Sequence, residues 1–249
     1  MSSPVLLITG GGRGIGAATV RLAAQRGFDV CLSWCNDEAS AQAVADEVTA
    51  TGRRVLLVRA DIGREEDVLS LFARCDRELG TLTALVNNAG ILEAQGRVED
   101  VTAERLSRIF AVNVTGAFLC AREAIRRMST ARGGTGGAIV NVSSMAARLG
   151  SAGEYVDYAA SKGAVDTMTV GLAREVATEG IRVNAVRPGL IHTEIHASGG
   201  EPNRVERLRN LVPMKRGGEA GEVAHAILWL LSEKASFTTG ALLDVAGGL

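Results

Sequence analysis

Short apolar runs alternate along the chain with longer segments in which apolar residues recur every three or four positions. The runs are rich in β-branched residues, which favours strands, and they cover 4–9, 28–34, 53–60, 82–87, 137–143, 181–186 and 241–246. The segments with helical periodicity cover about 14–26, 37–51, 64–79, 102–128, 155–178 and 219–232. Because the runs are apolar throughout, the strands are predicted to be buried on both faces of a parallel sheet.

This alternation of strand and helix predicts an α/β fold with a doubly wound parallel sheet, whose ligand lies beyond the carboxyl ends of the strands. A chain of 249 residues, 47% of them hydrophobic, is long enough for one well-buried domain, so we expect a single domain over 1–249. Functional residues should follow strands. The glycine-rich stretch 131–137 instead leads from a helix into a strand, at the opposite edge of the sheet, and is predicted to be a plain loop.

Composition and charge point to a small-molecule partner. The formal net charge is −1 with both signs scattered, which gives no basic surface for nucleic acid and no polybasic patch for a membrane. The chain opens without the features of a secretory signal, and no apolar run reaches the roughly 18 to 20 residues of a spanning helix. Cys31 and Cys35 would lie roughly 13 Å apart on a strand, too far for a disulfide. We therefore expect four reduced thiols and a cytoplasmic protein.

The turn after the first strand is rich in glycine and reads T-G-x-x-x-G-x-G from Thr9 to Gly16, rather than G-x-G-x-x-G. Glycines here let the backbone approach a pyrophosphate, which then lies on the N-terminus of the following helix. A tight structural turn is the alternative. Asp61 ends the third strand, where it suits an adenine amino group, and the fourth strand ends in Asn88, Ala89 and Gly90. These strand ends are predicted to converge on one dinucleotide cleft.

The second strand bears on the choice between NAD and NADP, because an acid at its end would hold the ribose 2′-hydroxyl and repel a 2′-phosphate. No acid stands there: Asp29 begins the strand, and Asp37, three residues past Trp34, is predicted to start the next helix. Arg13 in the glycine turn could pair with a 2′-phosphate, or be an ordinary solvated arginine. NADP(H) is therefore favoured over NAD(H).

Tyr158 and Lys162 lie four residues apart in a predicted helix, so their side chains share one face about 6 Å apart. A neighbouring ammonium stabilises a phenolate and lowers the phenol pKa, which would make Tyr158 a proton donor and acceptor. Tyr155 falls on the same face but lies roughly 10 Å along the axis from Lys162. It is interpreted as a wall of the substrate pocket, or as a residue at the helix start.

Six motifs follow in order along the chain: TGGGRGIG, NNAG, NVTGAF, IVNVSS, YAASK and VNAVRPG. In sequence and order they resemble the short-chain dehydrogenases/reductases, over essentially the full length. The resemblance implies hydride transfer between NADP(H) or NAD(H) and an alcohol or carbonyl, on a Rossmann-like sheet of about seven strands, usually in a homotetramer. A non-catalytic NADP(H) sensor is the alternative, although it would not need the tyrosine; a sugar-nucleotide epimerase would want a longer chain.

Carried over by position, the resemblance implies that Tyr158 is the acid/base. It implies that Lys162 binds the nicotinamide ribose and lowers the pKa of Tyr158. Ser144 would orient the substrate oxygen, and Asn113 would hold a water that links Lys162 to solvent. Taken alone, Ser144 could cap a turn and Asn113 could bond to a helix backbone. The residues expected to bind the cofactor are Gly10, Gly12, Arg13, Gly14, Ile15, Gly16, Trp34, Asp61, Ile62, Asn88, Ala89, Gly90, Tyr158, Lys162, Pro188, Gly189, Ile191 and Thr193.

Two departures from the family pattern stand out. Ser144 and Tyr158 are fourteen residues apart where thirteen is usual in the family, which is expected to alter the shape of the pocket. Ala246 stands where an aspartate is common, which is expected to affect a subunit contact. His192 and His196 lack the H-E-x-x-H spacing and a visible third ligand, so no metal site is predicted.

The stretch of about 190–217 is polar and rich in Gly, Pro and Arg, as expected of a mobile lid over the substrate. The chain as a whole is most similar to the family's sugar dehydrogenases and 3-oxoacyl-carrier-protein reductases. The expected substrate is therefore a sugar, a 3-oxoacyl thioester or another small carbonyl compound.

Overall fold

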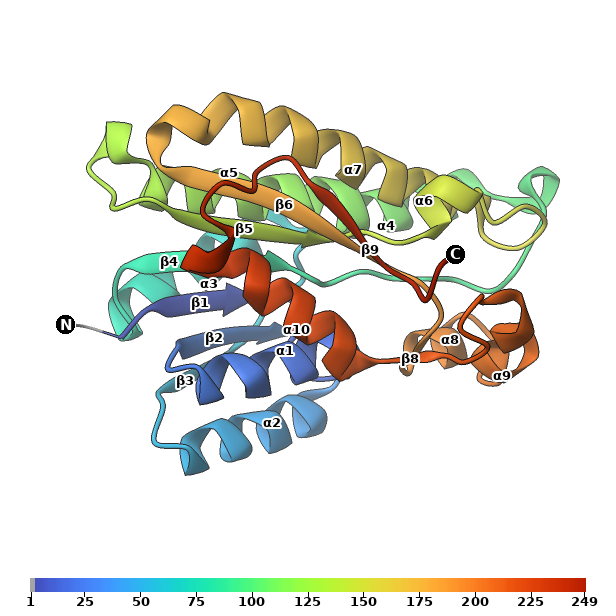
Figure 1. Ribbon diagram of the computed structural model, residues 1–249, viewed down its shortest axis with the longest axis horizontal. Coiled ribbons are helices and arrows are strands. Elements are labelled where there is room, and N and C mark those ends of the chain that lie inside the picture. The colour runs from blue at the N-terminus through green and yellow to red at the C-terminus, as the bar shows by residue number, and fades with distance from the viewer. Residues whose placement is uncertain (1–2) are drawn as a thin grey trace.

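Seven parallel strands form one twisted sheet in the order β3-β2-β1-β4-β5-β6-β9 (Figure 1). The computed structural model describes residues 3–249; Met1 and Ser2, which begin the stretch predicted to carry no signal, lie outside the described residues. The strands are β1 Val5–Ile8, β2 Asp29–Trp34, β3 Val55–Arg59, β4 Leu82–Asn87, β5 Gly137–Val142, β6 Ile181–Pro188 and β9 Leu242–Val245. The predicted doubly wound, Rossmann-like sheet is confirmed.

Helices connect the strands and occupy all six predicted helical segments. They are α1 Gly14–Gln25, α2 Glu38–Ala50, α3 Glu65–Glu78, α4 Ala103–Phe110, α5 Ala117–Met128, α6 Ala146–Leu149, α7 Val156–Val176, α8 Ile195–Ser198, α9 Arg204–Leu208 and α10 Ala220–Leu231. Three short helices, α6, α8 and α9, lie outside the predicted segments. The segment 102–128 differs in one respect from the prediction of one helix, because a π-helical turn, η2 Ala111–Gly116, separates α4 from α5. The 3-10 turns are η1 Val98–Asp100, η3 Thr130–Arg132, η4 Ala177–Glu179, η5 Arg209–Leu211 and η6 Glu233–Ala235.

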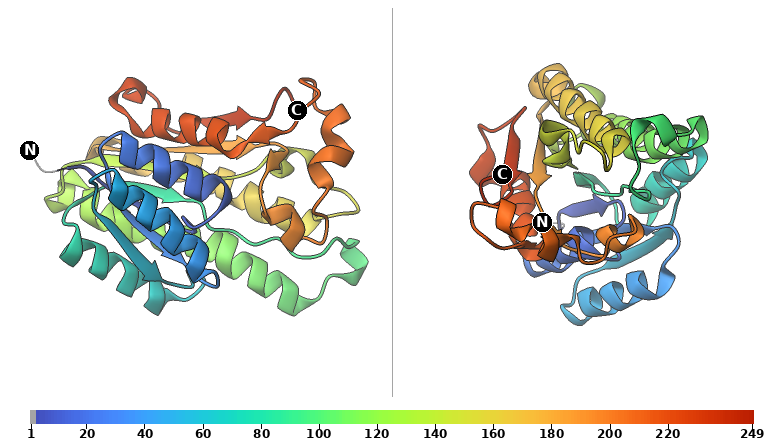
Figure 2. Two further views of the ribbon diagram at one scale, coloured as in Figure 1. Left: turned by 90° about the horizontal axis from the view of Figure 1, so that it is seen from below. Right: turned by 90° about the vertical axis from the view of Figure 1, so that its right-hand side faces the viewer.

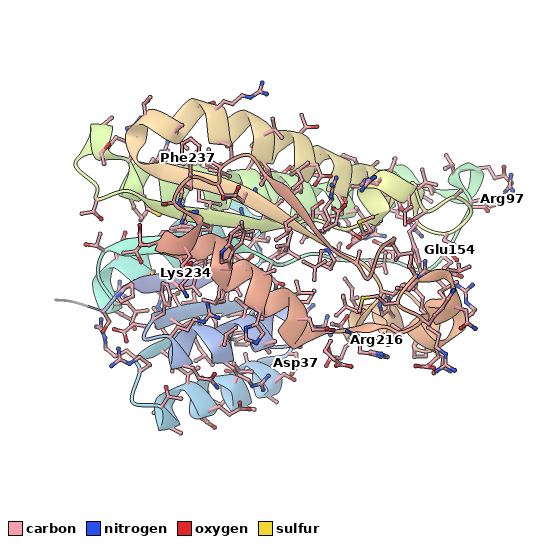
Figure 3. The ribbon with its side chains drawn as sticks, in the orientation of Figure 1. Asp37, Arg97, Glu154, Arg216, Lys234 and Phe237 are labelled. Carbon is pink, nitrogen blue, oxygen red and sulfur yellow. The ribbon has the colours of Figure 1, made fainter. Side chains whose placement is uncertain are left out.

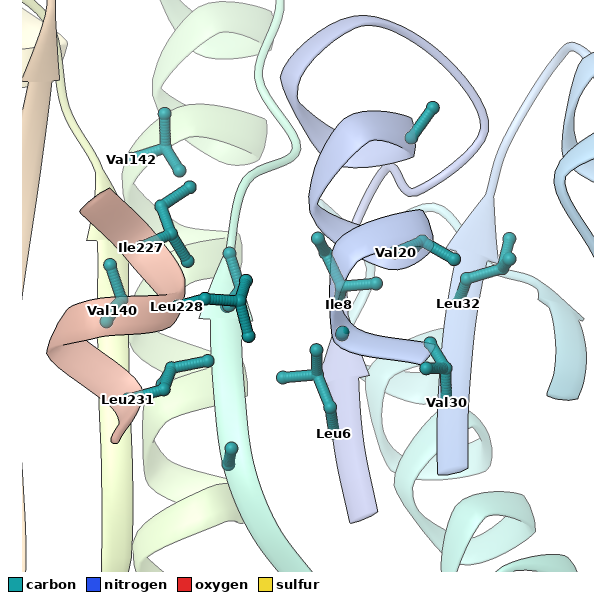
Figure 4. Packing of buried hydrophobic residues seen from close by; sticks show 14 of the residues in the cluster. Leu6, Ile8, Val20, Val30, Leu32, Val140, Val142, Ile227, Leu228 and Leu231 are labelled. Carbon is teal, nitrogen blue, oxygen red and sulfur yellow. The ribbon is translucent and has the colours of Figure 1, made fainter. Parts of the chain in front are cut away.

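The strands are buried on both faces, as their continuous apolar runs predict. Along β1, Leu6 and Ile8 face the layer of α1, α2 and α10, where they pack with residues such as Val20 and Leu228 (Figure 4). Leu7, between them, belongs to the core on the opposite face, under α3, α5 and α7. Figure 2 shows these two helical layers on either side of the sheet.

The strand order reverses between β1 and β4, and this places the site. Connections from β1 run outward through β2 and β3, while those from β4 run the other way through β5 and β6. The loops that follow β1 and β4 therefore diverge and leave a crevice at the carboxyl edge of the sheet. The glycine-rich stretch 131–137 leads into the opposite, amino end of β5, as expected of a plain loop.

The segment 190–217 extends beyond the carboxyl ends of the strands and carries α8, α9 and η5 (Figure 1). It is tied to the body by β7 Ile191–His192, which pairs in parallel with β8 Gly218–Glu219. Within residues 3–249, no helix has the length and apolarity needed to cross a bilayer. The four cysteines, Cys31, Cys35, Cys75 and Cys120, are free thiols, as expected.

Candidate active site

A cleft of about 990 Å³ opens at the crevice between the two halves of the sheet. One end is formed by the glycine turn and the ends of β2 and β3. The other end is formed by the loops after β4 and β5 together with the segment 190–217. The cleft is therefore long enough to join a nucleotide-binding end to a second compartment beneath that segment.

The glycine turn after β1 is held in shape by side chains from both strands beside it. The Thr9 hydroxyl accepts the backbone N–H groups of Asn88 and Ala89 at 3.1 and 3.0 Å. The Asn88 amide donates in return to the carbonyls of Thr9 and Gly10, both at 2.9 Å. Gly10 has φ +65°, and a Cβ on Gly16 would collide with the Gly10 carbonyl oxygen and stand 2.6 Å from Asn88 Nδ2. The turn thus has no room for side chains at these positions.

The N-terminus of α1 presents free backbone N–H groups to this turn. Arg13 is its N-cap residue, no side chain caps the helix, and its first turn holds no acid. By contrast, α2 is capped by Asp37, whose carboxylate accepts the Ser40 N–H at 3.0 Å. An uncapped end of a twelve-residue helix beside a glycine cradle fits the pyrophosphate of a dinucleotide.

The end of β2 carries no available acid, as predicted. Trp34 ends the strand and lines the cleft, while Asp29 begins the strand and is bound by Arg54. Asp37 also lines the cleft near the start of α2 (Figure 3), but its two oxygens accept from the Ser40 N–H and hydroxyl. Within the described chain, Arg13 has no carboxylate within 4.0 Å. Its guanidinium is therefore available to a ligand.

Asp61 and Ile62 line the cleft after β3, where the sequence places them. Asp61 Oδ1 accepts the Gly63 N–H at 2.9 Å, and its own N–H donates to Asp67 at 2.9 Å. One carboxylate oxygen of Asp61 remains without a protein hydrogen bond and could accept from an amino group.

Tyr158 and Lys162 meet at the middle of the cleft, one helical turn apart on α7. Lys162 Nζ lies 5.6 Å from the centre of the Tyr158 ring and donates to the Val142 carbonyl at 2.7 Å. The Ser144 hydroxyl, in the loop after β5, lies near enough to the Tyr158 phenol to oppose the rise in its pKa. The same hydroxyl accepts the Ala146 N–H at 3.1 Å, so Ser144 also caps the turn there. Three groups that can exchange protons with a bound oxygen thus converge.

Burial determines how Tyr158 and Lys162 titrate. It raises the pKa of Tyr158 to about 12, although the contact with Ser144 opposes the rise. It lowers the pKa of Lys162 to about 8, against the attraction of Asp166. The direction is opposite to the lowered Tyr158 pKa that the sequence led us to expect, because burial desolvates the phenolate. At neutral pH Tyr158 is therefore a proton donor.

Asn113 lies in the π-helical turn η2 and is buried behind the cleft. Its Nδ2 donates to the Ile91 carbonyl at 3.0 Å and to the Ser161 hydroxyl at 3.1 Å, and its Oδ1 accepts the Ile91 N–H at 2.8 Å. A Cβ on Gly90 would stand 3.4 Å from both Asn113 Oδ1 and Lys162 Nζ. Asn113 therefore adjoins the lysine but does not line the cleft.

Tyr155 precedes α7 rather than lying on it. Its φ of −145° and ψ of 50° are not helical, so the prediction that it shares a helical face with Lys162 is wrong. Its hydroxyl donates to the Gly199 carbonyl at 3.2 Å, and Arg204 stacks 5.0 Å above its ring. Tyr155 lines the cleft, so the interpretation as a pocket wall at the helix start is consistent with the structure.

The stretch between Ser144 and Tyr158, which is one residue longer than usual, contains unusual backbone. Between α6 and α7, Gly150, Ser151 and Gly153 all have positive φ, of 76°, 48° and 74°. Glu154, which follows directly, pairs with Arg204 and Arg207 of α9. The loop therefore places a carboxylate where it holds the segment 190–217, beside which Glu154 lies in Figure 3.

His192 is exposed on β7, and His196 Nε2 donates to the Ile191 carbonyl at 3.0 Å. Across residues 3–249, no three His, Cys, Asp or Glu side chains gather where they could hold a metal ion.

Most of the predicted site residues lie together in the cleft wall. Only Gly16, behind the glycine turn, and Asn113 do not line it. Sequence alone did not identify the residues that support them: Ser33, whose hydroxyl accepts the Gly10 N–H, and Ser161, which binds Asn113. It also did not identify Arg108 and Arg204 in the wall. Each of these four residues has a partner 15 to 50 positions away, which no local sequence pattern reveals.

Comparisons with known proteins agree with this geometry. Residues 10–249 match a family model described as enoyl-(acyl carrier protein) reductase. The chain is 57% identical to the uncharacterized oxidoreductase YgfF of Escherichia coli K12, over 98% of this chain and 99% of that one. It is 32% identical to glucose 1-dehydrogenase 2 of Bacillus subtilis, over 100% and 95% of the two chains.

Solved structures show the same fold with dinucleotides bound. A blue fluorescent protein from a metagenomic library, in complex with NADPH, matches with a TM-score of 0.90 and 33% identity over 99% of this chain and 98% of that one. A 3-ketoacyl-(acyl-carrier-protein) reductase of Brucella melitensis, complexed with NADH, matches with a TM-score of 0.90 and 34% identity over the same shares. The chain therefore belongs to the short-chain dehydrogenase/reductase family and is an NAD(P)-dependent oxidoreductase.

Proposed function

We propose that this protein interconverts an alcohol and a carbonyl compound by hydride transfer, with Tyr158 as the acid/base and NADP(H) as the preferred cofactor. The observation that supports this most directly is the convergence of Tyr158, Ser144 and Lys162 at the middle of the cleft, between its nucleotide end and its second compartment. A sensor would need the nucleotide end alone.

In the direction of reduction, the Ser144 hydroxyl orients the carbonyl oxygen and Tyr158 Oη gives it a proton. Lys162, fixed by the Val142 carbonyl, stabilises the phenolate that forms. The Asn113 amide is bound to the Ile91 carbonyl and to the Ser161 hydroxyl, next to Lys162. In this position Asn113 would retain a water molecule that relays protons. When bound, the dinucleotide supplies the hydride in reduction and accepts it in oxidation.

The glycine turn, the free end of α1 and the strand ends that follow would hold the dinucleotide, with Pro188, Gly189, Ile191 and Thr193 beside its nicotinamide. This class of function is tested by following NADPH and NADH absorbance with purified protein over a panel of ketones, diketones, acyl thioesters and sugars. Turnover of at least one compound is expected. Tight binding of NADPH without any turnover would favour the sensor instead.

The preference for NADP(H) rests on Arg13. Within the described residues its guanidinium has no carboxylate within 4.0 Å, whereas Asp37, the acid closest along the chain to the end of β2, already caps α2. A 2′-phosphate would pair with the arginine and meet no free carboxylate at Trp34. We expect Arg13→Ala to raise the KM for NADPH far more than the KM for NADH. An equal rise in both constants would contradict this role.

The segment 190–217 is proposed as the lid of a single catalytic domain over 1–249. Ion pairs of Arg204 and Arg207 with Glu154 hold it to the loop before α7, and the Tyr155 hydroxyl holds it at Gly199. These contacts would have to break and re-form when the segment moves during substrate entry.

We also propose a cytoplasmic homotetramer. Phe118 is 47% exposed beside a shallow hollow between α5 and α7, and Phe237, which follows α10, is fully exposed. These two exposed aromatic side chains, on separate elements, would supply the two contacts that a tetramer with dihedral symmetry requires. Light scattering after size exclusion should give four chains, and Phe118→Asp should yield dimers; a monomer in the unmodified protein would refute the proposal.

A further inference from the structure

The second compartment of the cleft is walled by apolar side chains from three separate chain segments. Leu92 follows β4, Met145 and Leu149 follow β5, and Ile195, Leu208 and Leu211 belong to the segment 190–217. The segments are in direct contact, since a Cβ on Gly199 would stand 2.8 Å from Leu92 and 3.1 Å from the Tyr155 hydroxyl. Leu149 and Leu211 remain 59% and 69% exposed.

The two arginines in this compartment are already paired with acidic side chains. Arg108 binds Glu93 through two hydrogen bonds of 2.9 and 3.0 Å. Arg204 lies between Glu154 and Glu201, with 11% of its side chain exposed. Each cation therefore has an acid beside it, and none is left to balance a carboxylate or a phosphate on a substrate.

Two neutral polar side chains of the compartment already have protein partners. The Tyr155 hydroxyl donates to the Gly199 carbonyl, and His196 Nε2 donates to the Ile191 carbonyl, while the buried His196 Nδ1 has no hydrogen-bond partner. Beyond these, the hydroxyl groups of Tyr158, Ser144 and Ser151 line the cleft. A ligand with several hydroxyl groups would find too few partners for them here.

From this distribution we infer that the substrate is an uncharged, mainly hydrocarbon ketone or secondary alcohol, whose one essential polar group is the reacting oxygen. The inference rests on the proposed function and narrows its substrate. A sugar would leave hydroxyl groups unpaired against Leu92 and Met145. A thioester on an acidic carrier protein would need free cations at the mouth of the cleft, where Arg204 and Arg207 are held by Glu154 and Glu201.

The test compares initial rates of NADPH oxidation with four probes: 4-methylcyclohexanone, 4-oxocyclohexanecarboxylate, glucose, and acetoacetyl N-acetylcysteamine. 2,3-Butanedione serves as a small reactive carbonyl that tests catalysis without testing the substrate class. We expect kcat/KM for the neutral ring ketone to exceed that for glucose by about 100-fold or more, because each hydroxyl buried without a partner lowers affinity by about tenfold. It should also exceed those for the carboxylate and the thioester.

Glucose, the carboxylate or the thioester as the best substrate, with butanedione reduced, would overturn the substrate class and leave the proposed function standing. Reduction of none of the five compounds would overturn the proposed function itself. Failure of the substrate class and failure of the proposed function are therefore distinguishable.

A pair of exposed leucines gives an independent test on a folded protein. Leu149→Gln and Leu211→Gln should each raise the KM for 4-methylcyclohexanone by about fivefold to tenfold with little change in kcat, the pattern of lost uniform apolar binding. The KM for NADPH should stay the same. Leu69→Gln is the matched control, because Leu69 is 42% exposed on α3 and does not line the cleft. Equal KM values in all three variants would contradict the inference.

Discussion

The ion pair between Arg105 and Asp157 joins α4 to the start of α7, one residue before Tyr158. Arg105 Nε donates to Asp157 at 2.5 Å and its Nη1 to the Ala94 carbonyl at 2.6 Å, while Asp157 also accepts the Tyr158 N–H at 2.9 Å. The two side chains are 14% and 3% exposed. Burial alone would raise the pKa of Asp157, but the bonds from Arg105 and from the Tyr158 N–H bring it below its usual value.

Removing one partner of such a pair leaves a buried charge uncompensated. We expect Arg105→Met to lower the free energy of unfolding by about 3 to 5 kcal/mol. For a chain of this length that corresponds to a fall in Tm of about 6 to 20 °C. The double variant Arg105→Met/Asp157→Leu should recover most of the loss, since it removes both charges.

The measurement is thermal unfolding by circular dichroism at one protein concentration and pH 7. Arg97→Met is the matched control, because Arg97 and its partner Glu99 are 70% and 66% exposed and the pair is screened by solvent. The control should leave Tm almost unchanged. A fall in Tm for Arg105→Met no larger than that of the control would refute the assignment of this pair as a buried support of the site.

The remaining predictions concern the glycine turn and the segment 190–217. Gly16→Ala should weaken NADPH binding in fluorescence titration by about tenfold or more, because its Cβ would meet the Gly10 carbonyl oxygen. Each tenfold loss of affinity corresponds to about 1.4 kcal/mol of binding free energy. Gly221→Ala is the control and should bind NADPH normally, since open space surrounds Gly221. Burial lowers the pKa of His196, so the unfolded chain takes up this proton first and stability falls as pH drops below about 6.5. His196→Gln should reduce that fall in Tm between pH 7 and 5, whereas a variant of exposed His225 should not.

The sheet could be predicted from sequence because each strand is marked by its own apolar run, and this local pattern recurs along the chain. Seven apolar runs buried on two faces, separated by helical periodicity, admit few arrangements other than a parallel doubly wound sheet. The π-helical turn at Ala111–Gly116 was missed, because one additional residue per turn barely changes the spacing of apolar positions. The two-residue strands β7 and β8 are too short to leave any pattern.

The part of the candidate site that lies on a single helix could be predicted from the spacing of its residues. The spacing of four between Tyr158 and Lys162 fixes their proximity on any helix, and α7 provides that helix. The titration of the pair was not predictable, since burial by the rest of the chain decides the direction of both pKa shifts. Likewise, Glu154 and Arg204 are 50 residues apart, and only the folded chain brings them together.

We assign Tyr158 as the acid/base and Tyr155 as a wall of the pocket. This assignment is tested most directly by the rate of NADPH oxidation at saturating carbonyl substrate in Tyr158→Phe and Tyr155→Phe, each with NADPH binding measured by fluorescence. Loss of a positioned acid should reduce kcat about 10³-fold in Tyr158→Phe with NADPH still bound. Tyr155→Phe should keep most of its kcat, because its hydroxyl donates to Gly199. A larger loss in Tyr155→Phe than in Tyr158→Phe would contradict the account.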